Sequence, residues 1–160
     1  MKVNREGGFT LLELMMVGVI ITILAAIVIP RMDFIFSKDE LRTSTTAVTS
    51  TLYLARMKAV SDGAMLGVQF DEDGTIQVVC NPLTTKDSLG PQNHIEDGVI
   101  FGEITFNDYL VVFNEFGQLD PSCLDGTGKY TGYIYMYNDI GDSTRVEVTM
   151  VTGRIRETNL

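Results

Sequence analysis

The feature that most constrains this chain is an apolar run near its amino end, from Phe9 to Ile29. These 21 residues match the roughly 20 that a helix needs to cross the hydrocarbon core of a bilayer. Lys2 and Arg5 precede the run, and such basic residues favour an amino terminus on the cytoplasmic side. The run therefore predicts one membrane-spanning helix, with the rest of the chain on the other side of the membrane.

A secretory signal peptide is the alternative, because it also joins basic residues to an apolar stretch. The run is longer than the usual apolar region of about 7–15 residues, and it ends without a clear small-residue cleavage site. We therefore favour a membrane helix.

Glu13 is the one ionisable residue inside the run. An ionised acid at the centre of a membrane helix costs about 2.5–3.5 kcal/mol, so such a residue usually has a partner. A cut between Gly8 and Phe9 would make Glu13 the fifth residue, one helical turn from a new positively charged amine. That amine and the positive end of the helix dipole could neutralise the carboxylate. The alternative is an acid at the membrane surface whose side chain reaches the water.

The residues GGFTLLEL, at positions 7–14, resemble the processing site of type IV pilins and type II secretion pseudopilins. In that family a membrane-embedded prepilin peptidase removes the leader after the glycine and methylates the new amino terminus. The family's glutamate pairs with the terminal amine of a neighbouring subunit during filament assembly. The resemblance implies that residues 1–8 are the leader, that Gly8 and Phe9 flank the cut, and that Glu13 is the assembly carboxylate.

Beyond the run, Pro30 predicts a kink or a short break, and it matches a proline commonly found near this point of the family's helix. A helical pattern then resumes, and Gly63 is a natural stop for it. We expect residues 30–62 to continue the helix into a soluble domain, whose β-rich part is residues 63–160. The apolar residues that share one face of this helix are Leu41, Val48, Leu52, Ala55 and Ala59.

After Gly63 the apolar residues alternate, which indicates strands. The acidic turn at 71–74 separates the first two and predicts a β-hairpin. Tyr133, Tyr135 and Tyr137 would share one strand face, with Ile134 and Met136 on the other. The predicted fold class is α+β, a long amino-terminal helix packed on antiparallel sheet. The expected strands cover 66–70, 76–80, 99–106, 110–116, 132–137 and 145–150.

The soluble part resembles the H-type minor pseudopilins and the FimT-like or FimU-like minor pilins. The segments that carry this resemblance are LYLARMKAV, VVFNEFGQLD and VEVTMVTGRIR. The resemblance implies a pilin-like fold with two antiparallel sheets and a subunit at or near the filament tip. Many major pilins have a disulfide loop at the carboxyl end, but Cys80 and Cys123 both lie well before the end of this chain.

Residues that could do chemistry are sparse. His94 is the one histidine and has no nucleophile motif nearby, and no phosphate-binding glycine motif occurs. The acidic turn at 71–74, Asp120 and Asp125 lack the spacing of a calcium-binding loop. We therefore expect neither an enzyme nor a cofactor or metal.

Two further features leave alternatives open. Cys80 and Cys123 form no short metal or redox motif, so they are either a disulfide or two free thiols. Residues 153–156 read GRIR and match the G-R-x-R motif of some FimT-like minor pilins that take up DNA, with Arg154 and Arg156 as DNA contacts. The other interpretation is that these arginines finish an edge strand and pair with carboxylates. We favour it because a net charge of −9 disfavours binding to nucleic acid.

The sequence thus predicts a minor pilin or pseudopilin, a single-pass protein of the inner membrane that joins a secretion pseudopilus or a type IV pilus. Its partners would be other pilin subunits, the prepilin peptidase and membrane lipid. The alternatives are a DNA-binding subunit for natural transformation and a stand-alone membrane-anchored protein with an uncleaved amino terminus.

Overall fold

The computed structural model describes residues 9–126 and 130–160, so the predicted leader at 1–8, with Gly8, lies outside the described residues. The chain divides into two units, one up to Phe36 and one from Ser37 to Leu160. The buried hydrophobic residues all lie between Leu41 and Ile155, inside the second unit. The second unit therefore has a complete core of its own, and we call it the domain.

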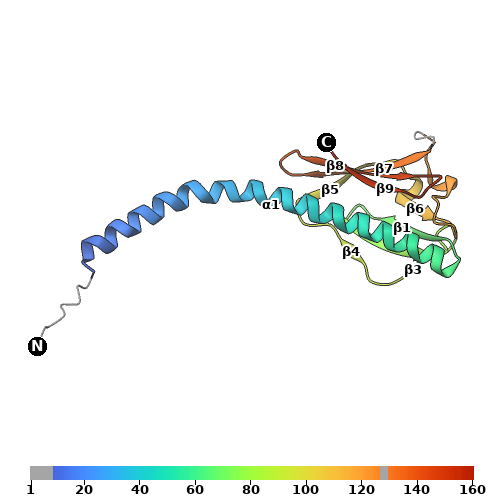
Figure 1. Cartoon of the computed structure of the whole chain (residues 1–160), viewed down its shortest axis with the longest axis horizontal. Helices are drawn as coiled ribbons and strands as arrows, with labels where there is room; N and C mark the ends of the chain where they lie inside the picture. Colours follow the sequence, from blue (N-terminus) through green and yellow to red (C-terminus); the bar gives the residue numbers. More distant parts are fainter. Residues whose placement is uncertain (1–8, 127–129) are drawn as a thin grey trace, which may run out of the picture. The chain divides into compact units, whose positions relative to one another are not determined.

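One helix, α1 (Leu11–Asp62), joins the two units (Figure 1). It is continuous at Pro30, so the short break that this proline predicts does not occur. A proline removes one backbone donor, and the helix on both sides of it can propagate without that bond. The helix ends as predicted at Gly63, which has a φ of +60°, and the amide of Ala64 donates to the carbonyl of Ala59 at 3.2 Å.

The face of α1 that the sequence predicts as apolar is the buried face. Leu41 is 6% exposed, and Val48, Leu52, Ala55 and Ala59 are fully buried. Thr45 is buried beside this face, and its hydroxyl is satisfied locally because it donates to the carbonyl of Leu41 at 2.7 Å. Helix and sheets thus share one core.

The first sheet has the order β3-β2-β1-β6, with β4 also paired to β2. The β1–β2 hairpin turns at the predicted acidic turn, where the amide of Asp71 donates to the carbonyl of Thr75 at 3.0 Å. The amide of Thr75 in turn donates to a carboxylate oxygen of Asp73 at 2.9 Å. The strands are β1 (Leu66–Phe70), β2 (Thr75–Cys80), β3 (Asp87–Ser88), β4 (Asn93–His94) and β6 (Leu110–Phe113).

The second sheet has the order β5-β7-β8-β9, and all of its neighbours are antiparallel. Its inner face buries Ile134 and Met136, while Tyr133, Tyr135 and Tyr137 lie on the outer face, as predicted. Figure 1 shows strands of both sheets beside the part of α1 that belongs to the domain. The strands are β5 (Val99–Ile104), β7 (Thr131–Asn138), β8 (Ser143–Thr149) and β9 (Ile155–Asn159).

The predicted strand at 110–116 was too long. The side-chain oxygen of Asn114 accepts hydrogen bonds from the amides of Phe116 and Gln118, so the chain turns immediately after Phe113. Two short 3₁₀ helices, η1 (Asn107–Tyr109) and η2 (Pro121–Cys123), flank β6.

His94, predicted in a loop, lies in the two-residue β4 with its side chain exposed.

The disulfide that the sequence leaves open is not formed, because both cysteines are free thiols. The sulfur of Cys80 is 3.4 Å from the carbonyl oxygen of Asp87, whereas that of Cys123 is 2.9 Å from the carbonyl of Asp120. Each thiol thus donates to its own local acceptor. Burial raises the pKa of the Cys123 thiol to about 11.

We predict that the two thiols of the folded domain react with iodoacetamide at different rates at pH 8. The half-buried Cys80 should react first, because the buried Cys123 is protonated at that pH and the thiolate is the nucleophile. Labelling of Cys123 should rise as the pH approaches 11. Peptide mass spectrometry measures both rates, with Cys80→Ser as the control. Fast labelling of Cys123 at pH 8 would contradict the buried position.

Candidate membrane segment and carboxyl-terminal arginines

The apolar start of α1 has the length and composition of a membrane span. The segment Leu11–Ile29 has 19 residues and a mean hydropathy of 2.7, and none of its side chains is buried in the described structure. Large apolar side chains from Leu11 to Ile29 are half or more exposed. A surface of this kind needs lipid or other helices around it.

Thr10 caps the amino end of this helix. The amide of Glu13 donates to the hydroxyl of Thr10 at 3.2 Å, and the amide of Leu14 donates to the carbonyl of Thr10 at 3.2 Å. Thr10 and Glu13 have the threonine-x-x-glutamate spacing of a capping box, a signal that our sequence analysis missed. Glu13 therefore lies in the first helical turn, where the positive end of the helix dipole favours a negative charge.

Thr22 and Gly18 lie further along the segment. The hydroxyl of Thr22 donates to the carbonyl of Gly18 at 2.8 Å, so it needs no outside partner. A methyl group at Gly18 would meet nothing within 4 Å. Packing within the described chain therefore does not require a glycine at this position.

The two carboxyl-terminal arginines lie at the edge of the second sheet. Arg156 is in the edge strand β9 and is the cross-strand neighbour of Glu147, while Arg154 comes just before that strand. Both arginines are exposed. A third arginine, Arg145 in β8, lies 5.1 Å from the centre of the Tyr133 ring and 3.9 Å from Glu147. Glu147 thus lies beside both Arg145 and Arg156, and Tyr133 lies beside Arg145.

Gly153, the first residue of the GRIR segment, has a structural role of its own. Its φ is +58°, and a Cβ atom there would lie 1.9 Å from the carbonyl oxygen of Gly117. Arg56 of α1 bridges the same two turns, because its guanidinium donates to the carbonyls of Gly117 and Thr152, each at 2.9 Å. The sequence analysis missed this role of Arg56, since only the fold brings the two turns together.

Possible metal ligands do not gather anywhere in the part of the chain that the structure describes. Within residues 9–126 and 130–160, no group of three or more histidine, cysteine or acidic side chains could hold a metal ion. The acidic turn at 71–74 is held by its own hydrogen bonds to Thr75.

Comparison with known proteins bears on both parts of the chain. Residues 3–29 match the prokaryotic N-terminal methylation motif. The domain is similar to the minor pseudopilin EpsH from the type 2 secretion system of Vibrio cholerae, at 13% identity and a TM-score of 0.55, covering 75% of this chain and 97% of that one. It is also similar to the type IV minor pilin FimU of Pseudomonas aeruginosa, at 14% identity and a TM-score of 0.59, covering 76% and 90%. No curated protein sequence matches the chain.

The chain thus combines an N-terminal methylation motif with a pilin-like fold. The α+β fold predicted from the sequence is confirmed, including the helix packed on two antiparallel sheets. The matched motif, residues 3–29, includes Gly8, Phe9 and Glu13, on which the predicted processing site rests. At identities of 13–14% the structural similarity concerns the fold alone.

We predict that Gly153→Ala destabilises the pilin-like domain much more than Gly63→Ala. Both glycines have nearly the same positive φ, +58° and +60°, so both substitutions carry the same left-handed backbone cost of about 1–2 kcal/mol. A Cβ at Gly63 meets nothing within 4 Å, whereas one at Gly153 meets the backbone of Gly117.

The added cost at Gly153 should be at least about 2 kcal/mol, because two turns must move apart. Urea unfolding of the two variants and of the unchanged domain measures the difference in unfolding free energy. Equal destabilisation by the two substitutions would show that the close approach of the turns does not matter.

Proposed function

We propose that this protein is a non-enzymatic structural subunit, processed after Gly8 and held in the inner membrane by residues 9–29 until it joins a filament. The amino terminus is cytoplasmic before processing, because Lys2 and Arg5 precede the membrane segment. The domain then lies on the opposite side of the membrane. Support comes from the methylation motif at 3–29, the exposed apolar helix and the pilin-like fold.

The position of Glu13 is the observation that carries this proposal. It is the one acid in the apolar segment, and the described structure places it in the first helical turn beside Thr10. If the chain is cut before Phe9, its own new amine lies close to that turn. In a filament the amine of a neighbouring subunit can take the same place, and the charge pair would fix the stagger of the two helices. In lipid, a lone ionised acid is costly enough to drive such pairing.

The remaining exposed faces of this helix would pack against the helices of other subunits. Gly18 fits that arrangement, since small residues let membrane helices approach one another closely. Its likeness in fold to EpsH and FimU supports a minor pilin or pseudopilin, and we propose further that the subunit lies at or near the filament tip. Its partners are then other pilin subunits and the prepilin peptidase. The filament itself is a secretion pseudopilus or a type IV pilus.

We predict that the mature protein begins at Phe9, carries one added methyl group on its amine, and fails to assemble when Glu13 is replaced by glutamine. Glutamine keeps the shape of the side chain but removes the charge that would pair with the amine. Intact-mass measurement on protein from its native membrane checks the first point. The amount of the subunit in sheared filaments checks the second.

A matched control is Glu72→Gln, which changes an exposed acid in the β1–β2 turn by the same chemistry. This variant should assemble normally. Both variants should still be cleaved, because Glu13 acts after processing. A mature chain that still starts at Met1, or normal assembly of the Glu13→Gln variant, would overturn the proposal.

DNA binding is the second candidate function, and the exposure of Arg154 and Arg156 is the observation that favours it. Arginine side chains on an open sheet edge can contact phosphates. Against it, Glu147 lies across from Arg156, and the close contact of Gly153 with Gly117 accounts for the glycine of the GRIR segment. We therefore keep the interpretation that these arginines finish an edge strand.

We predict that the purified domain, residues 37–160, does not bind duplex DNA at low salt. Binding that falls steeply with added salt, and that the double variant Arg154→Ala/Arg156→Ala removes, would instead establish the DNA-binding function. Lys86→Ala is the control, since it removes a positive charge from an exposed turn elsewhere in the domain. Fluorescence anisotropy over a salt series makes the measurement.

A further inference from the structure

The free edge of β9 borders a groove between the second sheet and α1. β9 is the last strand of that sheet, and it lies next to the domain part of α1 (Figure 1). At one end of the groove helix and strand touch, because the hydroxyl of Tyr53 donates to the carbonyl of Ile155 at 3.2 Å. Further towards the start of the domain, a cavity of 380 Å³ lies between them. We define the β9 groove by six residues that line this cavity, which are Lys38, Leu41, Arg42, Thr45, Glu157 and Asn159.

Main-chain groups on this edge of β9 face the groove. The amide of Thr149 in β8 donates to the carbonyl of Arg154 at 2.9 Å, so Arg154 and every second residue after it bond to β8. The residues between them direct their amides and carbonyls to the other side, which agrees with the contact of Ile155 with the helix. Within the part of the chain that the structure describes, the outward main-chain groups of Glu157 and Asn159 make no hydrogen bond. Such an edge is a template for another strand.

Arg42 lies on the opposite wall of the β9 groove. It is exposed, and its guanidinium makes no hydrogen bond or ion pair with any residue in 9–126 or 130–160. Arg56, about four helical turns further on, lies on the same side of α1 and donates to the main-chain carbonyls of Gly117 and Thr152. Arg42 carries the same five N–H donors. A ligand with main-chain carbonyls would supply the acceptor.

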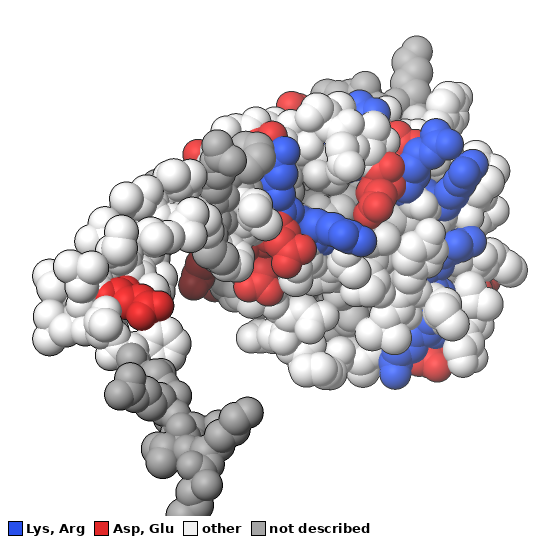
Figure 2. All heavy atoms as spheres, turned by 60° about the vertical axis from the view of Figure 1, so that its left-hand side comes forward, with Lys and Arg blue, Asp and Glu red and all other residues white. Residues whose placement is uncertain are grey.

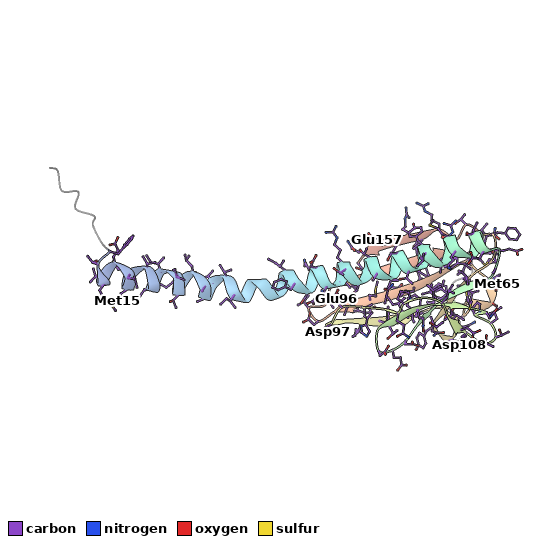
Figure 3. All side chains as sticks on the ribbon, turned by 90° about the horizontal axis from the view of Figure 1, so that it is seen from below. Met15, Met65, Glu96, Asp97, Asp108 and Glu157 are labelled. Atoms are coloured by element: carbon purple, nitrogen blue, oxygen red, sulfur yellow. The ribbon has the colours of Figure 1, made fainter. Side chains whose placement is uncertain are left out.

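The charges around the groove favour one kind of side chain. Figure 2 shows basic and acidic side chains next to one another on the face that it draws. Lys38 and Asp142 form an ion pair at 3.6 Å, so their charges offset each other. Glu157, labelled beside α1 in Figure 3, is exposed and shares the inner face of the sheet with its buried neighbour Val146. An inward-facing charge on an edge strand discourages pairing with an apolar strand, so an incoming strand needs a basic side chain there.

We propose that the β9 groove binds one extended peptide segment of another protein, which extends the second sheet beyond β9. Its main chain bonds to Glu157 and Asn159 on one side, and its opposite carbonyls accept hydrogen bonds from Arg42. Its side chain beside Glu157 is basic. In strand addition of this kind the main-chain bonds provide affinity, and the pockets for alternate side chains provide specificity.

The position of α1 explains why the occupant is a single strand. The helix lies across the groove from β9, in the space where the neighbours of an incoming strand would continue the sheet. A sheet edge, including β9 of a second copy, would therefore collide with α1, whereas a single segment brings no neighbours. The cavity of 380 Å³ is within the range of about 300–1,000 Å³ that is typical of ligand sites.

This inference does not rest on the proposed function, because the whole groove belongs to the domain and Glu13 takes no part in it. Its test therefore uses residues 37–160, which have a complete core. The first helical turn of this domain is held in place, since the side chain of Asn138 donates to the carbonyl of Ser37 at 3.2 Å. The probe is the capped pentapeptide Thr-Val-Lys-Val-Thr, whose lysine can lie beside Glu157.

Amide hydrogen exchange measured by NMR reports on each residue of the edge. In the free domain the amides of Glu157 and Asn159 should exchange fast, whereas those of Arg156 and Thr158, which bond to β8, should exchange slowly. With the peptide at about ten times its Kd, the two fast amides should become about tenfold slower. Unchanged exchange at the highest soluble peptide concentration would overturn the proposal. Slowing that needs no peptide and grows with domain concentration would also overturn it, because a second copy would then occupy the edge.

Glu157→Pro and Glu157→Gln separate the main chain from the charge. Proline at this position removes only an amide that faces the groove, so β9 should still pair with β8, which the slow amide of Thr158 checks. Peptide binding should nevertheless be lost. Glutamine keeps the amide, so this variant should bind, but without the about twofold to fivefold preference of the unchanged domain for lysine over glutamate at the centre of the peptide. Normal binding to the proline variant, or an unchanged preference in the glutamine variant, would contradict strand addition at this edge.

Arg42→Gln tests the other wall of the groove. It should weaken the binding of the lysine and glutamate peptides alike, by about tenfold, because a charged donor to the peptide main chain is lost. Arg156→Gln is the matched control, since Arg156 lies on the same strand as Glu157 but on the outer face of the sheet. This variant should bind both peptides like the unchanged domain. Equal weakening by the two substitutions would show that the groove is not the binding site.

Discussion

The burial of one face of α1 against both sheets is the interaction on which the domain depends. Leu52 and Val48 are fully buried on this face, and a buried aliphatic side chain contributes about 1.5–3 kcal/mol. Ala55 and Ala59 continue the same face and are also fully buried, so the last turns of the helix lie close to the sheets. Elsewhere on these turns, Met57 and Val60 are 70% and 52% exposed.

The sequence was sufficient for elements whose pattern is local. The buried face of α1, the β1–β2 hairpin and the two faces of β7 all follow from spacing alone, because each repeats over several residues. The two-residue strands β3 and β4 were missed, since pairing with distant residues defines them. The edge strand β9 was expected only through the preferred interpretation of Arg154 and Arg156, without bounds of its own. In the candidate site, the importance of Glu13 was readable from its apolar surroundings. The bridge from Arg56 to Gly117 and Thr152 was not, because its partners lie 61 and 96 residues away.

The same bridge fixes the end of the domain where α1 stops. Turns at the end of a sheet are usually mobile. Here the close contact of Gly153 with Gly117 and the two hydrogen bonds from Arg56 join both turns to the last part of α1. Phe116 and Val151 therefore belong to one rigid end with Met57.

The amino end of the helix is likewise held by local hydrogen bonds. The hydroxyl and carbonyl of Thr10 accept hydrogen bonds from the amides of Glu13 and Leu14, and both of these capping bonds lie after Phe9. A cut between Gly8 and Phe9 would leave both of these groups of Thr10 in the chain. The new amine would appear one residue before a cap that is already formed. Because the first turn keeps its geometry, the carboxylate of Glu13 would stay at the helix start, where a neighbouring amine can reach it.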